Sequence, residues 1–166
     1  MELELTHPYE AGLNDVLGTF FSRDRILEKN TREGSRNVKV RELSLDEASA
    51  RIVIEREVTS STDVPSILAS FHREWNEVSQ DEHWFRKSQD EWHCEFRVRI
   101  DGVPAKIRGM MKLKGDSQSC TNQVSLKVRS DLPLIGKKIA KFLAEDSRIK
   151  IEEEYQATRR LLQQQD

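Results

Sequence analysis

A chain of 166 residues is close to the usual size of one domain, and we predict a single domain over residues 1–166. Hydrophobic residues make up 36% of the chain and charged residues 34%, without the low complexity or large net charge that is typical of disorder. The 27 basic and 29 acidic residues give a formal net charge of -2, so no overall positive field favours nucleic acid and we expect no such partner.

The first third of the chain predicts a strand, two short helices and a hairpin. Residues 2–5 alternate between charged and apolar in a strand that we expect to end at Pro8, because proline restricts the residue before it. Apolar residues recur at helical spacing over residues 13–20, and a second short helix follows Ser22. Residues 38–58 return to a period of two on either side of a polar turn, which is typical of a hairpin.

The middle of the chain predicts the main part of a sheet. The stretch 75–86 is ambiguous, because Val78 and Trp84 share one parity whereas Trp75 and Phe85 share the other, which indicates a bulge or a segment outside a strand. Three consecutive antiparallel strands, each with one apolar and one charged face, are much clearer. They cover residues 92–100, 105–113 and 120–128.

A long amphipathic helix is predicted at the C-terminus. Pro133 suits its first turn, and Asp131 is a candidate N-cap just upstream. Apolar residues from Ile135 to Leu162 form one stripe, and no proline interrupts the segment. A helix of about 30 residues at 1.5 Å per residue is ~45 Å long, so it must lie across the whole sheet.

The sequence shows no targeting, membrane-spanning or metal-binding pattern. The N-terminus lacks an apolar run behind a basic start, and no segment approaches the roughly 20 apolar residues that span a bilayer, so we expect a cytoplasmic protein. Cys94 and Cys120 have neither CxxC spacing nor a histidine cluster nearby. This favours two buried, reduced thiols, with no metal site and no cofactor.

The order of elements, together with three short strings, resembles a known family. The strings are Val64-Pro65-Ser66-Ile67-Leu68, Gly102-Val103-Pro104 followed by Gly109 and Leu113, and Leu132-Pro133-Leu134-Ile135-Gly136. The whole resembles the START and Bet v 1-like (SRPBCC) superfamily of polyketide cyclases and lipid-transport proteins, and within it a bacterial branch of unknown function.

That resemblance implies an α+β helix-grip fold. A curved seven-stranded antiparallel sheet with strand order 1-7-6-5-4-3-2 wraps around the long C-terminal helix, and two short helices follow strand 1. The resemblance also implies a ligand cavity between sheet and helix. It places the strands of Cys94 and Cys120 two spacings apart, roughly 9.5 Å, which is too far for a disulfide.

The inward parity of the strands, together with the helix stripe, predicts the lining of that cavity. For most of these residues, plain core packing is the alternative. Gly109 admits a ligand or permits a bulge, and the bulge is favoured. Arg56 suits the carboxylate or phosphate of an amphipathic ligand, although an ion pair within the protein or exposure at a strand end is favoured. The predicted lining is Arg56, Trp92, Phe96, Val98, Ile107, Gly109, Met111, Asn122, Val124, Leu126, Phe142 and Leu143.

Three functions fit these features. Binding or carriage of a small hydrophobic or amphipathic molecule is favoured, with a polyketide-cyclase-type enzyme and an interaction module with a filled cavity as alternatives. Catalysis has little support, because the histidines are scattered; His83 beside Glu82 suits proton transfer at a pocket mouth, but a surface histidine is favoured. An open apolar pocket would favour the carrier. Titratable groups that converge in the pocket would favour the enzyme, and a filled cavity would favour the interaction module.

The side chains on the outward face of the strands form a predicted basic band, and weak contact with anionic membranes is one interpretation of it. An ordinary solvated sheet face is the favoured alternative, and we expect a monomer. The residues predicted for this band are Arg97, Arg99, Lys106, Arg108, Lys112 and Lys114.

Overall fold

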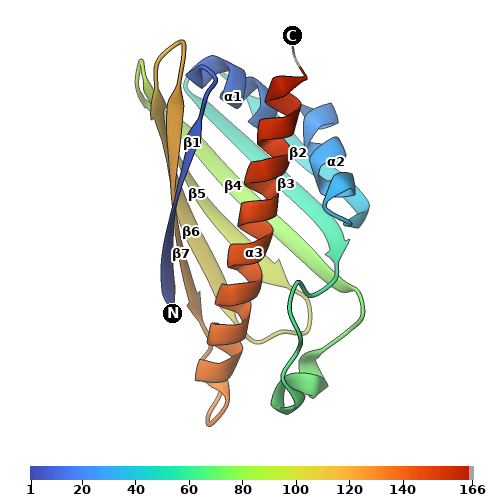
Figure 1. Ribbon diagram of the computed structural model, residues 1–166. Coiled ribbons are helices and arrows are strands. Elements are labelled where there is room, and N and C mark those ends of the chain that lie inside the picture. The colour runs from blue at the N-terminus through green and yellow to red at the C-terminus, as the bar shows by residue number, and fades with distance from the viewer. Residues whose placement is uncertain (165–166) are drawn as a thin grey trace.

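The computed structural model describes residues 1–164, which build one seven-stranded antiparallel sheet that wraps around a long helix (Figure 1). The sheet order is β1-β7-β6-β5-β4-β3-β2. Fold class and strand order are therefore confirmed. The elements are β1 (Glu2–Tyr9), α1 (Leu13–Phe20), α2 (Arg23–Arg32), β2 (Arg36–Leu45), β3 (Ser49–Val58), the 3-10 helix η1 (Ser66–Phe71), β4 (Asn76–Ser88), β5 (Glu91–Ile100), β6 (Lys106–Gly115), β7 (Cys120–Arg129) and α3 (Gly136–Gln163).

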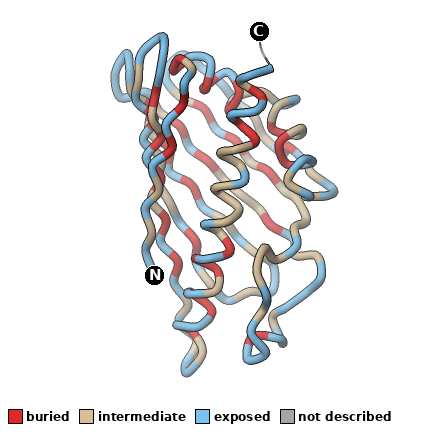
Figure 2. The backbone as a smooth tube through the Cα atoms, viewed as in Figure 1, coloured by how far each residue is buried: buried red, intermediate tan, exposed pale blue. Residues whose placement is uncertain are grey.

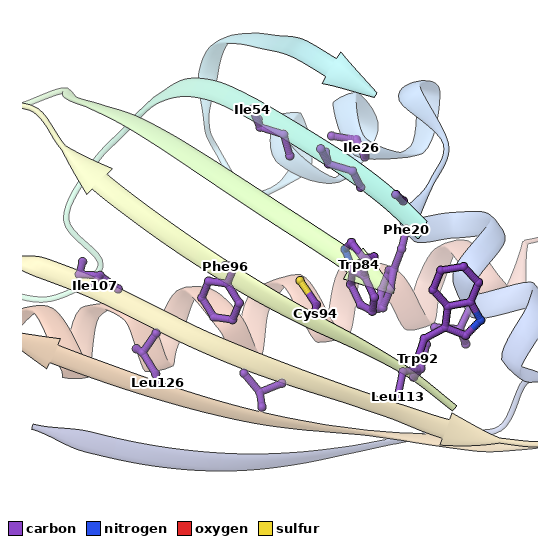
Figure 3. Close-up of a cluster of buried hydrophobic side chains, with 14 of the residues drawn as sticks. Phe20, Ile26, Ile54, Trp84, Trp92, Cys94, Phe96, Ile107, Leu113 and Leu126 are labelled. Atoms are coloured by element: carbon purple, nitrogen blue, oxygen red, sulfur yellow. The ribbon is translucent and has the colours of Figure 1, made fainter. Parts of the chain in front are cut away.

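Strict alternation along the central strands gives the sheet one buried and one exposed face (Figure 2). The strands β5, β6 and β7 pair in continuous register, so a row such as Phe96, Gly109 and Leu126 lies side by side across them. Because a slip of one residue would turn every apolar side chain toward water, burial of one parity fixes the register. Figure 3 shows the resulting core, with Phe96, Ile107 and Leu126 on its sheet side.

The helices cover the concave face. The Ser22 side chain accepts a hydrogen bond from the Arg25 backbone N–H and so caps α2. The 28 residues of α3 span about 42 Å, long enough to cross the sheet along its length (Figure 1). Among residues 1–164, none of the helices has both the length and the apolar character needed to cross a membrane.

Two sequence-based boundaries are wrong. β1 continues through Pro8 to Tyr9, because β1 is an edge strand whose other side needs no hydrogen bond from the missing proline N–H. α3 begins at Gly136 rather than near Pro133, and Asp131 accepts from the Arg129 side chain instead of capping the helix. A turn at Pro133, Leu134 and Ile135 delays the helix.

β4 covers all of the ambiguous stretch except Trp75. Val78 and Trp84 face inward and are buried, while Phe85 faces outward and packs against His93. Trp75 lies just before the strand, where the Arg36 guanidinium stacks over its ring. The one register shift with β5 falls between Arg86 and Ser88, at the end of the strand, so the two parities need no central bulge.

Candidate functional site

A cavity of about 180 Å³ lies between the concave face of the sheet and α3. Its walls come from β1, α2, the strands β3 to β7 and the stretch of α3 from Asp146 to Thr158. Apolar side chains from the centre of the sheet form one part of the lining, and polar or charged side chains from α2, β3, β4 and α3 form another. The pocket is therefore amphipathic.

Most of the residues that the sequence predicts for the lining do face this cavity. Their alternation on β5, β6 and β7 brings them to the concave side, where Phe96 and Val124 are 6% and 4% exposed. Whether they contact a ligand stays a prediction. The residues brought together are Arg56, Phe96, Val98, Ile107, Met111, Asn122, Val124 and Leu126.

Trp92 and Gly109 lie outside the lining, which corrects the prediction for both. The Trp92 ring packs edge-on against Phe21, with 5.6 Å between the ring centroids, at the end of the sheet that α1 covers. Gly109 lies beneath the Phe96 ring, because a Cβ built on it would be 2.1 Å from Phe96 Cζ. The register continues through Gly109 without a bulge, so this glycine accommodates an aromatic neighbour.

Phe142 and Leu143 also lie outside the lining. They are on α3 before Asp146, where the part of the helix that faces the cavity begins. Ala140 and Ala144 in this stretch are 6% and 2% exposed, and such small side chains let a helix approach a sheet closely. The apolar stripe was predicted correctly, but its first turns form solid core.

A chain of hydrogen bonds crosses the pocket wall from β3 to β4. Arg56 Nη2 donates to Gln80 Oε1 at 3.2 Å, and Gln80 Nε2 donates to Glu82 Oε2 at 2.6 Å. Glu82 Oε1 accepts from Trp84 Nε1 at 2.8 Å. Burial and then the negative charge of Glu154 raise the pKa of Glu82, so its proton affinity depends on this dry environment.

Sequence reasoning missed this network although its signal was present. Gln80 and Glu82 share the parity of Val78 and Trp84, so the uninterrupted strand had to turn both polar side chains inward. The ambiguity about the strand hid that consequence. Buried polar groups are strong candidates for function, because leaving them unpaired costs free energy.

A second charged cluster joins α2 to α3. Lys29 Nζ is 3.2 Å from Glu154 Oε1 and donates to Thr158 Oγ1 at 3.4 Å. Burial, followed by repulsion from Glu154, raises the pKa of Glu33 to about 8, and Glu33 Oε1 is buried without a hydrogen-bond partner among residues 1–164. Burial lowers the pKa of Arg56, which these carboxylates oppose. Titratable groups of both signs therefore meet in the pocket.

Asn122 forms a polar point on the β7 side of the cavity. It is 3% exposed, and within residues 1–164 its Nδ2 donates only to Met111 Sδ at 3.5 Å, a weak bond. Its Oδ1 has no partner within the described chain. Its neighbour in register, His7, stacks on the Tyr155 ring with 4.1 Å between centroids and bonds to Glu152 at 3.0 Å.

His83 and the basic band lie on the other face of the sheet. His83 is exposed beside Asp81, 3.4 Å away, so Glu82 and not His83 faces the pocket. The basic residues lie on adjacent strands β5 and β6, and all are exposed. Contact of this band with a membrane stays a prediction. The band comprises Arg97, Arg99, Lys106, Arg108, Lys112 and Lys114.

Several known structures share this architecture. The Zhui aromatase/cyclase from Streptomyces sp. R1128 superposes with a TM-score of 0.64 at 9% identity, over 98% of this chain and 93% of that one. A START superfamily protein from Mycobacterium smegmatis gives a TM-score of 0.57 at 12% identity over 99% of both chains. Ara h 8.0201 gives 0.63 at 10% identity, over 99% of this chain and 98% of that one. These likenesses define the class of fold, which is the START and Bet v 1-like helix-grip fold that the sequence predicts.

The sequence also defines the family within that fold. Residues 4–162 match the family described as Protein of unknown function (DUF2505), and the chain belongs to this family. No curated protein matches the sequence. The predicted resemblance to a branch of unknown function is confirmed, and the function of the pocket must be inferred from its residues.

Proposed function

We propose that this protein binds a small amphipathic molecule in the cavity between the sheet and α3. The observation that carries the proposal is one pocket of about 180 Å³ that combines an apolar wall with the Arg56, Gln80 and Glu82 network. A cavity of about 150 Å³ is large enough to hold benzene, so this pocket suits one ring or a short chain. Buried apolar area then provides affinity, and the polar wall provides orientation.

The charges around Arg56 favour a ligand without a carboxylate or phosphate. Among the surrounding carboxylates, Glu154 acts most strongly on this guanidinium, so an incoming anion meets its repulsion as well as the attraction of Arg56. A hydroxyl, amide or amine group avoids that cost and can bond to the free oxygen of Asn122. We therefore propose a neutral or donor-rich polar group on the ligand.

Native mass spectrometry of freshly purified protein tests the binding function. A bound small molecule should appear as a mass increment and be identifiable after release. Val98→Phe places a ring in the lining and should reduce the occupied fraction, whereas Val103→Phe, outside the lining, should retain it. A clean apo mass from several expression hosts, or equal occupancy in both variants, contradicts the proposal.

The convergence of titratable groups supports a second candidate, an enzyme of the polyketide-cyclase type that uses the same pocket. A carboxyl with a pKa of about 8, such as Glu33, exchanges protons near neutral pH, as general acid and base catalysis requires. An enzyme should convert the bound molecule during incubation, and Glu33→Gln should slow conversion while retaining the bound mass. A ligand that stays unchanged in the wild type favours the binder. An interaction module with a filled cavity is less favoured, because space remains in the pocket.

A further inference from the structure

One loop of this protein projects an apolar side chain entirely into solvent. Leu134, between β7 and α3, is 99% exposed, whereas the next most exposed large hydrophobic residues, Met1 and Leu45, are 57% and 54% exposed. Isolated surface leucines are common, but nearly complete exposure means that no other side chain shields it. The loop thus holds Leu134 away from the protein.

The backbone at Leu134 is in a conformation that leucine disfavours. Its φ is 69°, a region that branched side chains rarely occupy. The Ile135 N–H donates to the Pro133 carbonyl at 2.8 Å, which closes a three-residue turn around Leu134. Asparagine or glycine would meet this geometry with less strain, so a leucine here violates a local preference, as functional positions often do.

Three lysines without acidic partners among residues 1–164 follow this leucine in the sequence. Lys137, Lys138 and Lys141 follow it at the start of α3, and all are exposed. None of them forms an ion pair with any residue of the described chain, while the nearby acids Asp131 and Glu145 are already paired with arginines. The first turn of α3 contains no acidic residue, although acids are favoured there. On a chain with a net charge of -2, this end is locally positive.

We propose that the tip formed by Leu134, Lys137, Lys138 and Lys141 docks on an anionic lipid bilayer. Leucine would enter the boundary between headgroups and acyl chains while the lysines contact the headgroups. Charge complementarity favours lipid over a protein partner, because protein interfaces are depleted of lysine and centred on larger apolar clusters. The short helix η1 lies at the same end of the molecule as the start of α3 (Figure 1), and its Ile67 is 47% exposed.

This docking is independent of any ligand in the pocket, and one leucine with three lysines gives weak, reversible binding. Flotation with vesicles containing about 30% phosphatidylserine in phosphatidylcholine tests it. The full chain should bind at low salt, should be released at about 0.5 M salt, and should ignore pure phosphatidylcholine.

Two variants separate docking from folding. Leu134→Asn removes the apolar side chain while fitting the positive φ, and Lys137→Glu with Lys138→Glu reverses the charge while placing acids where a helix start favours them. Each should lower the vesicle-bound fraction at limiting lipid about tenfold and leave Tm unchanged or raised. A loss of binding at an unchanged or raised Tm then cannot come from unfolding.

Two control variants test whether docking depends on this tip and not on another part of the surface. Leu45→Asn changes an exposed leucine at the opposite end of the sheet, and Lys112→Glu with Lys114→Glu changes the basic band. Both should bind like the wild type. No binding to anionic vesicles at low salt, binding that persists at high salt, or binding lost only in the Lys112 and Lys114 variant would each overturn the proposal.

Discussion

The contact between Gly109 and Phe96 shows how a single residue shapes the pocket wall. The absent side chain of Gly109 leaves space for the Phe96 ring, which then contributes to both core and lining. A Cβ at position 109 would also be 2.7 Å from the Ser125 carbonyl oxygen, which belongs to the backbone and moves little. We predict that Gly109→Ala lowers the free energy of unfolding by about 1–3 kcal/mol, measured by urea denaturation.

Gly18 provides the matched control for that substitution. It lies inside α1, and a Cβ there would meet no atom within 4 Å. Gly18→Ala should raise the free energy of unfolding by about 0.5–1 kcal/mol, because alanine loses less backbone entropy in a helix. Equal effects at the two positions would contradict the packing argument for Gly109.

Burial of Glu33 makes the protein less stable as pH rises. Its pKa of about 8 in the folded protein is above the ordinary 4.5, so between these values the folded state binds more protons than the unfolded state. The contribution of Glu33 to the free energy of unfolding is fully present below about pH 4.5 and is lost as pH rises through about 8. We predict that Glu33→Gln gains stability over the wild type across this range, on the order of 1–3 kcal/mol by pH 9.

Urea midpoints at about pH 5, 7 and 9 measure this difference. Glu57→Gln is the control, because the Glu57 side chain accepts from Asn37 and its pKa is lowered. Its variant should show no gain with rising pH. A constant difference between wild type and Glu33→Gln over the whole range would contradict the raised pKa.

The sequence predicts well which face of the sheet a side chain takes, and predicts poorly which distant residues it contacts. Phe96, Ile107, Val124 and Leu126 are buried as predicted, because period-two alternation alone decides which face they take. Glu33 could not be found in this way, since its burial results from the approach of α3 to α2, which are far apart in the sequence. Local patterns carry no information about that contact.

At the scale of elements, a polar link ties the connection after β3 to α3. Asp146 Oδ1 accepts from the Ser61 backbone N–H at 2.5 Å, and its Oδ2 is 2.5 Å from Lys150 Nζ, which also donates to Ser61 Oγ at 2.9 Å. All three residues line the pocket. We predict that Asp146→Ala costs about 1–3 kcal/mol and speeds hydrogen exchange at the Ser61 amide, because a partly buried donor loses its acceptor.

Mass-spectrometric hydrogen exchange over residues 59–65 measures that release. The control is Glu145→Ala on the same helix, which breaks an exposed pair with Arg148 at 2.5 Å and should leave both stability and exchange at the Ser61 amide unchanged. Unchanged exchange in Asp146→Ala would show that the connection is held by other contacts.

Element boundaries were predicted less well than element types. Pro8 suggests a break in any strand and is tolerated in β1 only because this strand is at the sheet edge, a fact that depends on the pairing of β1 with β7. Pro133 fits the first turn of a helix equally well in sequence, but the turn at Leu134 intervenes. Both errors arise where tertiary context overrides a local preference.

Across the whole molecule, the two cysteines lie in regions that we expect to open with different free energies. Cys94 is 0% exposed in the central strand β5, and Cys120 is 4% exposed at the start of β7, paired with Gly115 at the hairpin end. Burial raises the pKa of both thiols, that of Cys120 to about 11, so neither reacts readily in the folded protein. Labelling therefore reports opening of the structure.

We predict that Cys120 is labelled at least about tenfold faster than Cys94 under native conditions, because fraying of the β6–β7 hairpin exposes it while Cys94 requires global unfolding. Thiol labelling at about pH 8 with increasing urea measures both rates, and the variants Cys94→Ala and Cys120→Ala assign them. The Cys94 rate should rise with the full denaturant dependence of unfolding, and the Cys120 rate should rise less steeply at low urea. Equal rates with equal slopes would mean that the sheet opens as one unit, and the hairpin end would then be as stable as the centre.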